Sequence, residues 1–199
     1  MGRNAVDKKR NSKRAKTKKW AEELMPKLQE ISIASLTIDE LAHLMGKSKS
    51  TIYQYFKSKE EILAYTVEVR LEQMSDFRTI FRQEPFQPVA QFEAFLKLIC
   101  KGAQDISPRF LHDLKANYPL AWQQIEIFFL ELLQETIHFY ETGIQKSYFE
   151  PISTNLLARL DHVFIFQIMS DPNSLDENTT LDDLVRDYLL LRFNGIMRR

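Results

Sequence analysis

The feature that most constrains the fold of this chain is a short segment, residues 35–60, in which three residues stand at a fixed spacing. Ala42 is small, as is required where one helix crosses close over another. Gly46 follows at a position just after a helix end, which favours a left-handed backbone. Ile52 would then pack the second helix against the first, and the opposite face of residues 48–55 would point outward. This spacing predicts a helix-turn-helix, the unit that places a helix in the major groove of DNA.

The charge of the chain is divided between its two parts, although the formal net charge is zero. Residues 1–60 carry 14 Lys or Arg and 7 Asp or Glu, whereas residues 61–199 carry 13 and 20. The first twenty residues hold nine basic side chains, opposed only by Asp7. A basic run by itself is most often a solvated tail, but directly before a helix-turn-helix it favours contact with DNA phosphates.

The sequence lacks the features of membrane proteins, exported proteins, enzymes and metal-binding proteins. No run approaches the roughly 18 apolar residues of a membrane span, and no apolar signal core is present at the N-terminus, so we expect neither a membrane association nor export. The single cysteine, Cys100, lies in an apolar run typical of a buried thiol and suits the reducing cytoplasm, where we expect the protein to act. Without a phosphate-binding loop, a nucleophile motif or histidines at metal-ligand spacing, we expect no enzyme activity, no cofactor and no metal site.

Apolar residues recur at helical spacing along most of the chain, which predicts an all-α fold of about nine helices. The first is expected from about Thr17, with Pro26 either kinking it or beginning a fresh turn. A long helix is expected from Ser58 to about Arg82, and a turn is expected at residues 171–174.

The segment after the turn carries the most specific pattern, and with it the chain resembles the TetR family of bacterial transcriptional regulators. Residues 51–53, 55–56, 58–60 and 62–63 (Thr-Ile-Tyr, Tyr-Phe, Ser-Lys-Glu and Ile-Leu) follow that family's recognition-helix signature almost residue for residue. Ile38, Leu41, Ala42 and Gly46 extend the match upstream, and residues 110–122 and 143–152 show a looser likeness. The resemblance implies a DNA-binding head joined by a long helix to a larger helical domain. We expect a disordered basic arm over residues 1–15, a helix-turn-helix head over 16–58 and a ligand-sensing and dimerisation domain over 59–199.

The residues expected to face DNA come from the helical register together with the resemblance. Lys49 suits guanine and Gln54 suits adenine, whereas Thr37, Tyr53 and Lys59 match positions that touch phosphates in the family. Lys47 stands where the family has a small apolar residue, so it either adds a contact to DNA or loosens the turn. The expected set is Thr37, Lys47, Ser48, Lys49, Ser50, Thr51, Tyr53, Gln54, Tyr55 and Lys59.

The last two predicted helices carry more apolar surface than one buried face accounts for. A single helix-turn-helix makes too few contacts for a useful specificity, so we expect a homodimer on a palindromic operator in double-stranded DNA. The residues expected at the dimer surface, with ordinary core packing as the alternative, are Leu156, Leu160, Val163, Phe164, Leu184, Tyr188 and Leu191.

Fourteen phenylalanines are many for 199 residues, and aromatic side chains gather in segments that line a ligand cavity in TetR-like proteins. The resemblance therefore implies an apolar pocket for a hydrophobic or aromatic effector, whose binding shifts a repressor away from its DNA-bound state. The alternatives are that these residues only fill the core, and that the chain is a sensor or interaction protein without a specific operator. The expected pocket residues are Phe92, Phe95, Ile99, Phe110, Leu114, Tyr118, Trp122, Phe129, His162 and Phe166.

Overall fold

A computed structural model describes residues 3–170 and 179–198, and these residues form an all-α fold, as the sequence predicts. The predicted turn at residues 171–174 lies outside the described residues. Ten helices are described, α1 (Arg3–Gln29), α2 (Ile38–Leu44), α3 (Lys49–Tyr53), α4 (Lys59–Glu72), α5 (Phe77–Phe81), α6 (Pro88–Ala103), α7 (Pro108–Asn117), α8 (Pro119–Gln145), α9 (Thr154–Ser170) and α10 (Leu181–Ile196).

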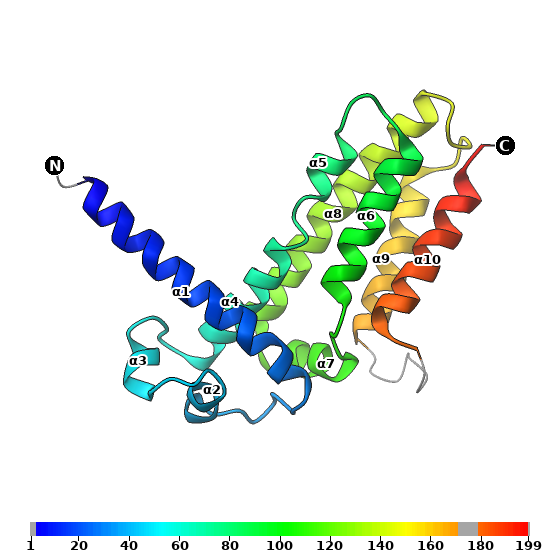
Figure 1. Cartoon of the computed structure of the whole chain (residues 1–199). Coiled ribbons are helices and arrows are strands. Elements are labelled where there is room, and N and C mark those ends of the chain that lie inside the picture. The colour runs from blue at the N-terminus through cyan, green and yellow to red at the C-terminus, as the bar shows by residue number, and fades with distance from the viewer. Residues whose placement is uncertain (1–2, 171–178, 199) are drawn as a thin grey trace.

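The helices form a small head and a larger bundle that share one apolar core (Figure 1). Helices α1 to α3 form the head, and α6, α8, α9 and α10 run side by side in the bundle, with α7 across the end nearest the head. Helix α4 links the two parts, and its main packing partners are α8 and α1. Buried residues from Leu24 in the head to Phe193 in the last helix belong to a single cluster, so the head cannot move without disturbing side chains of the bundle.

Helix α1 begins earlier than predicted and continues through Pro26. It begins at Arg3, so the structure gives residues 3–15, for which a disordered arm is predicted, as helix, and its first half projects away from the head (Figure 1). Residues 3–25 contain no Gly or Pro and many Ala, Lys and Arg, which are strong helix formers. Pro26 lies inside the same helix and does not begin a new one. Because it stands close to the end at Gln29, its missing N–H removes little of the hydrogen-bond ladder.

The helix predicted from Ser58 to about Arg82 is divided in two. Helix α4 ends at Glu72, and the Ser75 hydroxyl donates to the Glu72 carbonyl oxygen at 2.8 Å, which competes with helix continuation. The break brings Met74 against Gly102 of α6, where a Cβ would lie 1.7 Å from the Met74 sulfur. Helix α5 then starts at Phe77 and packs on α6 and α8.

We expect Gly143→Ala to destabilise the protein, because a Cβ at this position in α8 would lie 2.0 Å from Cδ2 of the buried Phe149 ring. The core atoms must shift to make room for the added methyl group, and this strain lowers the free energy of unfolding by about 1–3 kcal/mol. Gly195→Ala is the matched control: Gly195 is also helical, and a Cβ there meets nothing within 4 Å. The control should gain up to about 1 kcal/mol. Equal midpoints for the two variants in urea denaturation would contradict the close packing of α8 on Phe149.

Candidate nucleic-acid interface and cavities

The turn between α2 and α3 is closed by backbone hydrogen bonds. Gly46 has φ +63°, the left-handed conformation that the sequence predicts for it. Its N–H donates to the His43 carbonyl oxygen at 2.9 Å, and the Lys47 N–H donates to the Ala42 carbonyl oxygen at 2.9 Å. These two bonds form a Schellman motif, which satisfies the last carbonyls of α2. Lys47 therefore takes part in closing the turn through its backbone.

Both helices of the motif also begin at the residues that the sequence indicates. Thr37 caps α2 in a capping box with Glu40, whose carboxylate accepts from the Thr37 N–H at 2.8 Å. Ser48 caps α3 and accepts from the Thr51 N–H at 3.2 Å. The side chains of Thr37, Ser48 and Thr51 are thus engaged in helix caps, which fixes the direction of each helix.

Helix α3 has one buried and one exposed face. Ile52 is fully buried and packs toward the core of the head. On the other side Ser50 and Gln54 are exposed, and Tyr53 is 52% exposed although it is a large aromatic residue. An exposed face of hydroxyl and amide groups on a short helix is suited to hydrogen bonding with base edges or phosphates.

Trp20 of α1 organises the end of α3, a role that the sequence analysis missed. The Tyr55 ring meets the Trp20 ring edge-on at 4.9 Å, and the Lys47 ammonium lies 5.3 Å from the Trp20 ring centre. Tyr55 is half-buried by this contact, so the expectation that it points outward is wrong. Lys47 is held beside the aromatic face, which contributes on the order of 0.5–1 kcal/mol at an accessible site.

Lys49 and Lys59 both have partners within the chain. The Lys49 ammonium lies 2.9 Å from the Asp39 carboxylate, which accepts its hydrogen bond and raises the pKa of Lys49. The Lys59 ammonium donates to the Leu36 carbonyl oxygen at 3.0 Å and lies 5.6 Å from the ring centre of Tyr118. Either lysine would have to exchange these partners in order to reach a phosphate.

The loop between α1 and α2 is bound to the end of the bundle by several hydrogen bonds. Asp113 of α7 accepts from the Ser32 hydroxyl at 2.8 Å and from the Ile33 N–H at 3.0 Å through the same oxygen, Oδ2. The buried Tyr118 hydroxyl donates to the Ile33 carbonyl oxygen. On the α1 side, the Gln29 side chain accepts from the Ser107 N–H at 2.9 Å. These bonds attach the head to α7, and they involve residues that have no local sequence signal.

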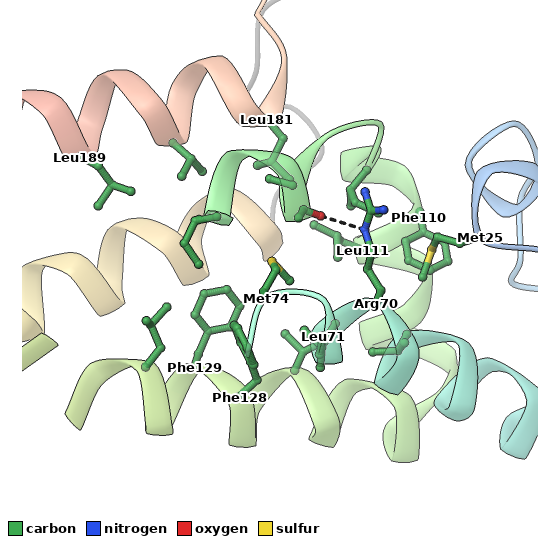
Figure 2. A pocket seen from close by; sticks show the side chains of 18 of the residues that line it. Met25, Arg70, Leu71, Met74, Phe110, Leu111, Phe128, Phe129, Leu181 and Leu189 are labelled. Atoms are coloured by element: carbon green, nitrogen blue, oxygen red, sulfur yellow. Dashed lines mark hydrogen bonds between the residues drawn. The ribbon is translucent and has the colours of Figure 1, made fainter. Parts of the chain in front are cut away.

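An apolar cavity of about 110 Å³ lies inside the bundle, with Met25 of the head at one side (Figure 2). Of the residues expected in a pocket, Phe95, Ile99, Phe110 and Phe129 line it. It is bounded also by Met25 from α1 and by residues of α4, α7, α8 and α10. Further lining residues that the sequence analysis did not name include Leu71, Met74, Leu111, Phe128, Leu181 and Val185.

A second, smaller cavity of about 40 Å³ lies farther along the bundle. It contains two more of the expected pocket residues, Phe92 and His162, together with the polar side chains of Thr136, Tyr140 and Asp161. Phe166 belongs to the residues whose side chains are not described.

Leu114, Tyr118 and Trp122 line neither of these cavities. All three are buried. Tyr118 reaches the head loop instead, and the Trp122 indole N–H donates to Glu126 at 2.9 Å on its own helix. Their aromatic or apolar character follows from core packing, which a sequence pattern does not distinguish from cavity lining.

The expected dimer residues on α9 and α10 divide into exposed and packed groups. Leu156, Leu160, Val163 and Leu191 are exposed, with Val163 at 60% and Leu191 at 75%. Phe164 and Tyr188 stack on each other within one chain at 3.8 Å between ring centres, and Leu184 is half-buried. Leu156, Leu160 and Val163 are spaced along one face of α9, and Leu191 is exposed on α10.

Within the described residues, no helix is long and apolar enough to cross a membrane, and no cluster of His, Cys, Asp or Glu could hold a metal ion. Cys100 is half-buried, with its thiol 3.8 Å from the Asp182 carbonyl oxygen, and burial raises the pKa of the thiol.

We expect Tyr118→Phe to lower the free energy of unfolding by about 0.5–1.5 kcal/mol, because it removes the hydroxyl bond to the Ile33 carbonyl and leaves that oxygen only the Leu36 N–H at 3.3 Å. Tyr148→Phe is the control, since Tyr148 is exposed, and it should change stability by no more than about 0.5 kcal/mol. Urea denaturation followed by tryptophan fluorescence measures both. An unchanged midpoint for Tyr118→Phe would show that this bond does not hold the head on the bundle.

The sequence and the fold are similar to those of known regulators. A sequence model described as bacterial regulatory proteins, tetR family, matches residues 28–66, which include α2, the turn and α3. An uncharacterised HTH-type transcriptional regulator of Bacillus subtilis (strain 168), YvaF, is 23% identical over 163 residues, which are 81% of this chain and 86% of YvaF.

Among solved structures, the TetR family regulator PfmR of Thermus thermophilus has a TM-score of 0.64 at 17% identity, covering 89% of this chain and 99% of that one. NalD of Pseudomonas aeruginosa, described as the secondary repressor of the MexAB-OprM multidrug efflux pump, has a TM-score of 0.61 at 17% identity, covering 94% and 98%. These structures share the fold of the head and of the bundle together. The head therefore matches the TetR family of bacterial regulatory proteins in sequence, and the chain as a whole has the fold of TetR family regulators.

Proposed function

We propose that this protein is a cytoplasmic, non-enzymatic repressor that binds a palindromic operator as a homodimer and leaves it when a small apolar molecule binds. The observation that carries the proposal is the exposed polar face of α3 opposite the buried Ile52, mounted on a closed turn. Such a helix can enter a major groove without disturbing the core behind it. Repression is the part that rests on similarity, since NalD is described as a repressor.

The charges around α3 support a role in binding DNA. The exposed Lys16 and Lys19 of α1 add to Lys47, Lys49 and Lys59 of the motif. Together they give this end of the molecule a positive surface that attracts phosphates. Asp39 offsets part of that charge through its contact with Lys49. Lys49 then exchanges one anionic partner for another on binding, which favours a readily reversible complex.

The apolar surface of α9 and α10 supports a homodimer. Leu156, Leu160 and Val163 follow one another along α9 at helical spacing, and Leu191 stands on the neighbouring α10. Pairing two copies of this surface gives an isologous contact in which the same residues meet across a two-fold axis. A two-fold axis in the protein matches the symmetry of a palindromic operator, whose half-sites lie about 34 Å apart.

The position of the larger cavity supports control by a ligand. One wall is Met25 of the head, and another is formed by Phe110 and Leu111 of α7. Asp113, which holds Ser32 and Ile33 of the head loop, lies on the same short helix. A ligand that shifts α7 or α4 would therefore change the position of the head on the bundle. A small rotation of each head would then alter the distance between the two α3 helices of a dimer.

The second candidate is a sensor of the same fold that binds no specific operator, favoured by the engagement of Lys49 and Lys59 within the chain. Selection of bound fragments from genomic DNA separates the two functions. An enriched palindrome, protected over two half-sites, supports the repressor. Binding that depends on salt but has no sequence preference supports the sensor instead.

We expect Gln54→Ala to relax discrimination at one base position of each half-site, by about 1–3 kcal/mol if the amide contacts a base edge. Gln73→Ala is the matched control, because Gln73 is also an exposed glutamine that ends a helix, far from the turn. Binding to a set of single-base operator variants measures both. If Gln54→Ala weakens all sites equally, its amide does not recognise a base.

We expect Val163→Glu to give a monomer at micromolar concentration, because it buries a charge in the proposed dimer contact. Leu130→Glu, which changes a similarly exposed residue on α8, should leave the dimer intact. Sedimentation velocity measures the mass of each. A dimer that persists in Val163→Glu and dissociates in Leu130→Glu would place the contact on α8.

A further inference from the structure

We propose that the ligand of this protein is an elongated, uncharged molecule with an apolar body and a single hydrogen-bond donor at one end, such as a medium-chain alcohol. The body would occupy the larger cavity and the donor would reach Asp161 through the smaller one. Naming this ligand as the effector rests on the proposed function, but its chemistry is argued from the two cavities alone.

The two cavities share walls. Phe95, Phe129, Leu132 and Leu189 line both of them, so only side chains separate the two spaces. Phe129 is half-buried and faces the larger cavity from α8 (Figure 2). Rotation of such a side chain would join the cavities into one elongated site, and Met25 and Met74 at the other end are flexible enough to adapt to its length.

The larger cavity offers no counter-ion to a charged ligand. Among its described lining residues, Arg70 is the single ionisable one, and the rest are apolar side chains or Gly102. The Arg70 guanidinium donates from Nε to the Gly102 carbonyl oxygen at 3.0 Å and from Nη2 to the Gln104 carbonyl oxygen at 2.5 Å. It thereby caps the C-terminus of α6, where a cation is favourable, and Figure 2 shows the bond to Gly102. Its aliphatic stem is what remains to contact a ligand.

The smaller cavity ends at a buried carboxylate that still has room for a donor. Asp161 is 6% exposed, and its Oδ1 accepts from the Tyr188 hydroxyl at 2.6 Å and from Arg192 Nε at 3.0 Å. Among the described residues, its Oδ2 accepts from the Tyr140 hydroxyl alone, at 3.3 Å, which is long for this type of bond. Burial, followed by the nearby Asp161 charge, raises the pKa of Tyr140, so its phenol stays a donor. Because Tyr140 and Asp161 both line the cavity, a ligand hydroxyl can supply the bond that Oδ2 lacks.

The charge of Asp161 is already paired with that of Arg192, which favours an uncharged ligand over an ionic one. A carboxylate placed here would meet a second carboxylate, and an ammonium group would meet the Arg192 guanidinium. The volumes, about 110 and 40 Å³, together match an apolar cavity that is known to hold benzene, so a longer chain needs the side chains between the two spaces to move.

The test compares ligands of equal length on the full chain by titration calorimetry. Octanol should bind, whereas dibutyl ether, an isomer that cannot donate, should bind about ten-fold or more weakly, and octanoate and octylamine more weakly still. Ether or octanoate binding as tightly as octanol would overturn the proposal.

Variants of the cavity give a second measurement. Val185→Phe fills the larger cavity and should abolish octanol binding, whereas Val89→Phe on the exposed face of α6 should leave it unchanged. Asp161→Asn should reduce the preference for octanol over the ether. If Val185→Phe binds octanol as the unaltered protein does, the site lies elsewhere and the proposal is wrong.

Release from DNA is measured separately by adding octanol to the operator complex. If octanol binds in the cavity and leaves the DNA affinity unchanged, the proposed regulatory function fails and the ligand chemistry stands. If octanol shows no preference over the ether, the ligand chemistry fails whatever the effect on DNA.

Discussion

The rest of the structure depends on the attachment of the head loop to α7. One carboxylate oxygen, Oδ2 of Asp113, receives both the Ser32 hydroxyl and the Ile33 N–H, and Tyr118 binds the Ile33 carbonyl from the other side. Hydrogen bonds to a charged acceptor are stronger than bonds between neutral groups, and two donors on one oxygen fix the orientation of the loop as well as its distance. The direction in which α2 and α3 leave the bundle is set here, because the loop leads directly into the cap of α2.

This attachment lies next to the larger cavity, and under the proposed function that proximity would couple DNA binding to ligand binding. Helix α7 contributes Phe110 and Leu111 to the cavity wall and Asp113 to the head loop, over little more than one turn. Helix α4 does the same on its own side, with Val67 and Leu71 at the cavity and Lys59 bound to the Leu36 carbonyl. Under the proposed function, a ligand that shifts either packed helix would also displace the head.

Acidic side chains pair with some of the basic side chains of the head and reduce its positive charge. Asp39 binds Lys49, and Glu72 at the end of α4 binds Arg14 at 3.1 Å and Lys18 at 3.1 Å. These pairs are exposed and contribute little to stability, typically about 0–1 kcal/mol. Their consequence is for binding: they hold three cations of the head in place while reducing the positive field that would attract any polyanion.

The sequence by itself determined the helix-turn-helix, its caps and the all-α class, because these depend on local geometry: Gly46 adopts φ +63° and Thr37 and Ser48 cap their helices as predicted. It also found the cavity wall in part, through Phe95 and Phe110. Only the tertiary structure decided that Tyr118 binds the head and Tyr55 packs on Trp20, because an aromatic residue at helical spacing looks the same in a core, a cavity or an interface. The break after Glu72 and the contacts of Asp113 likewise depend on residues far apart in the chain, which no local pattern specifies.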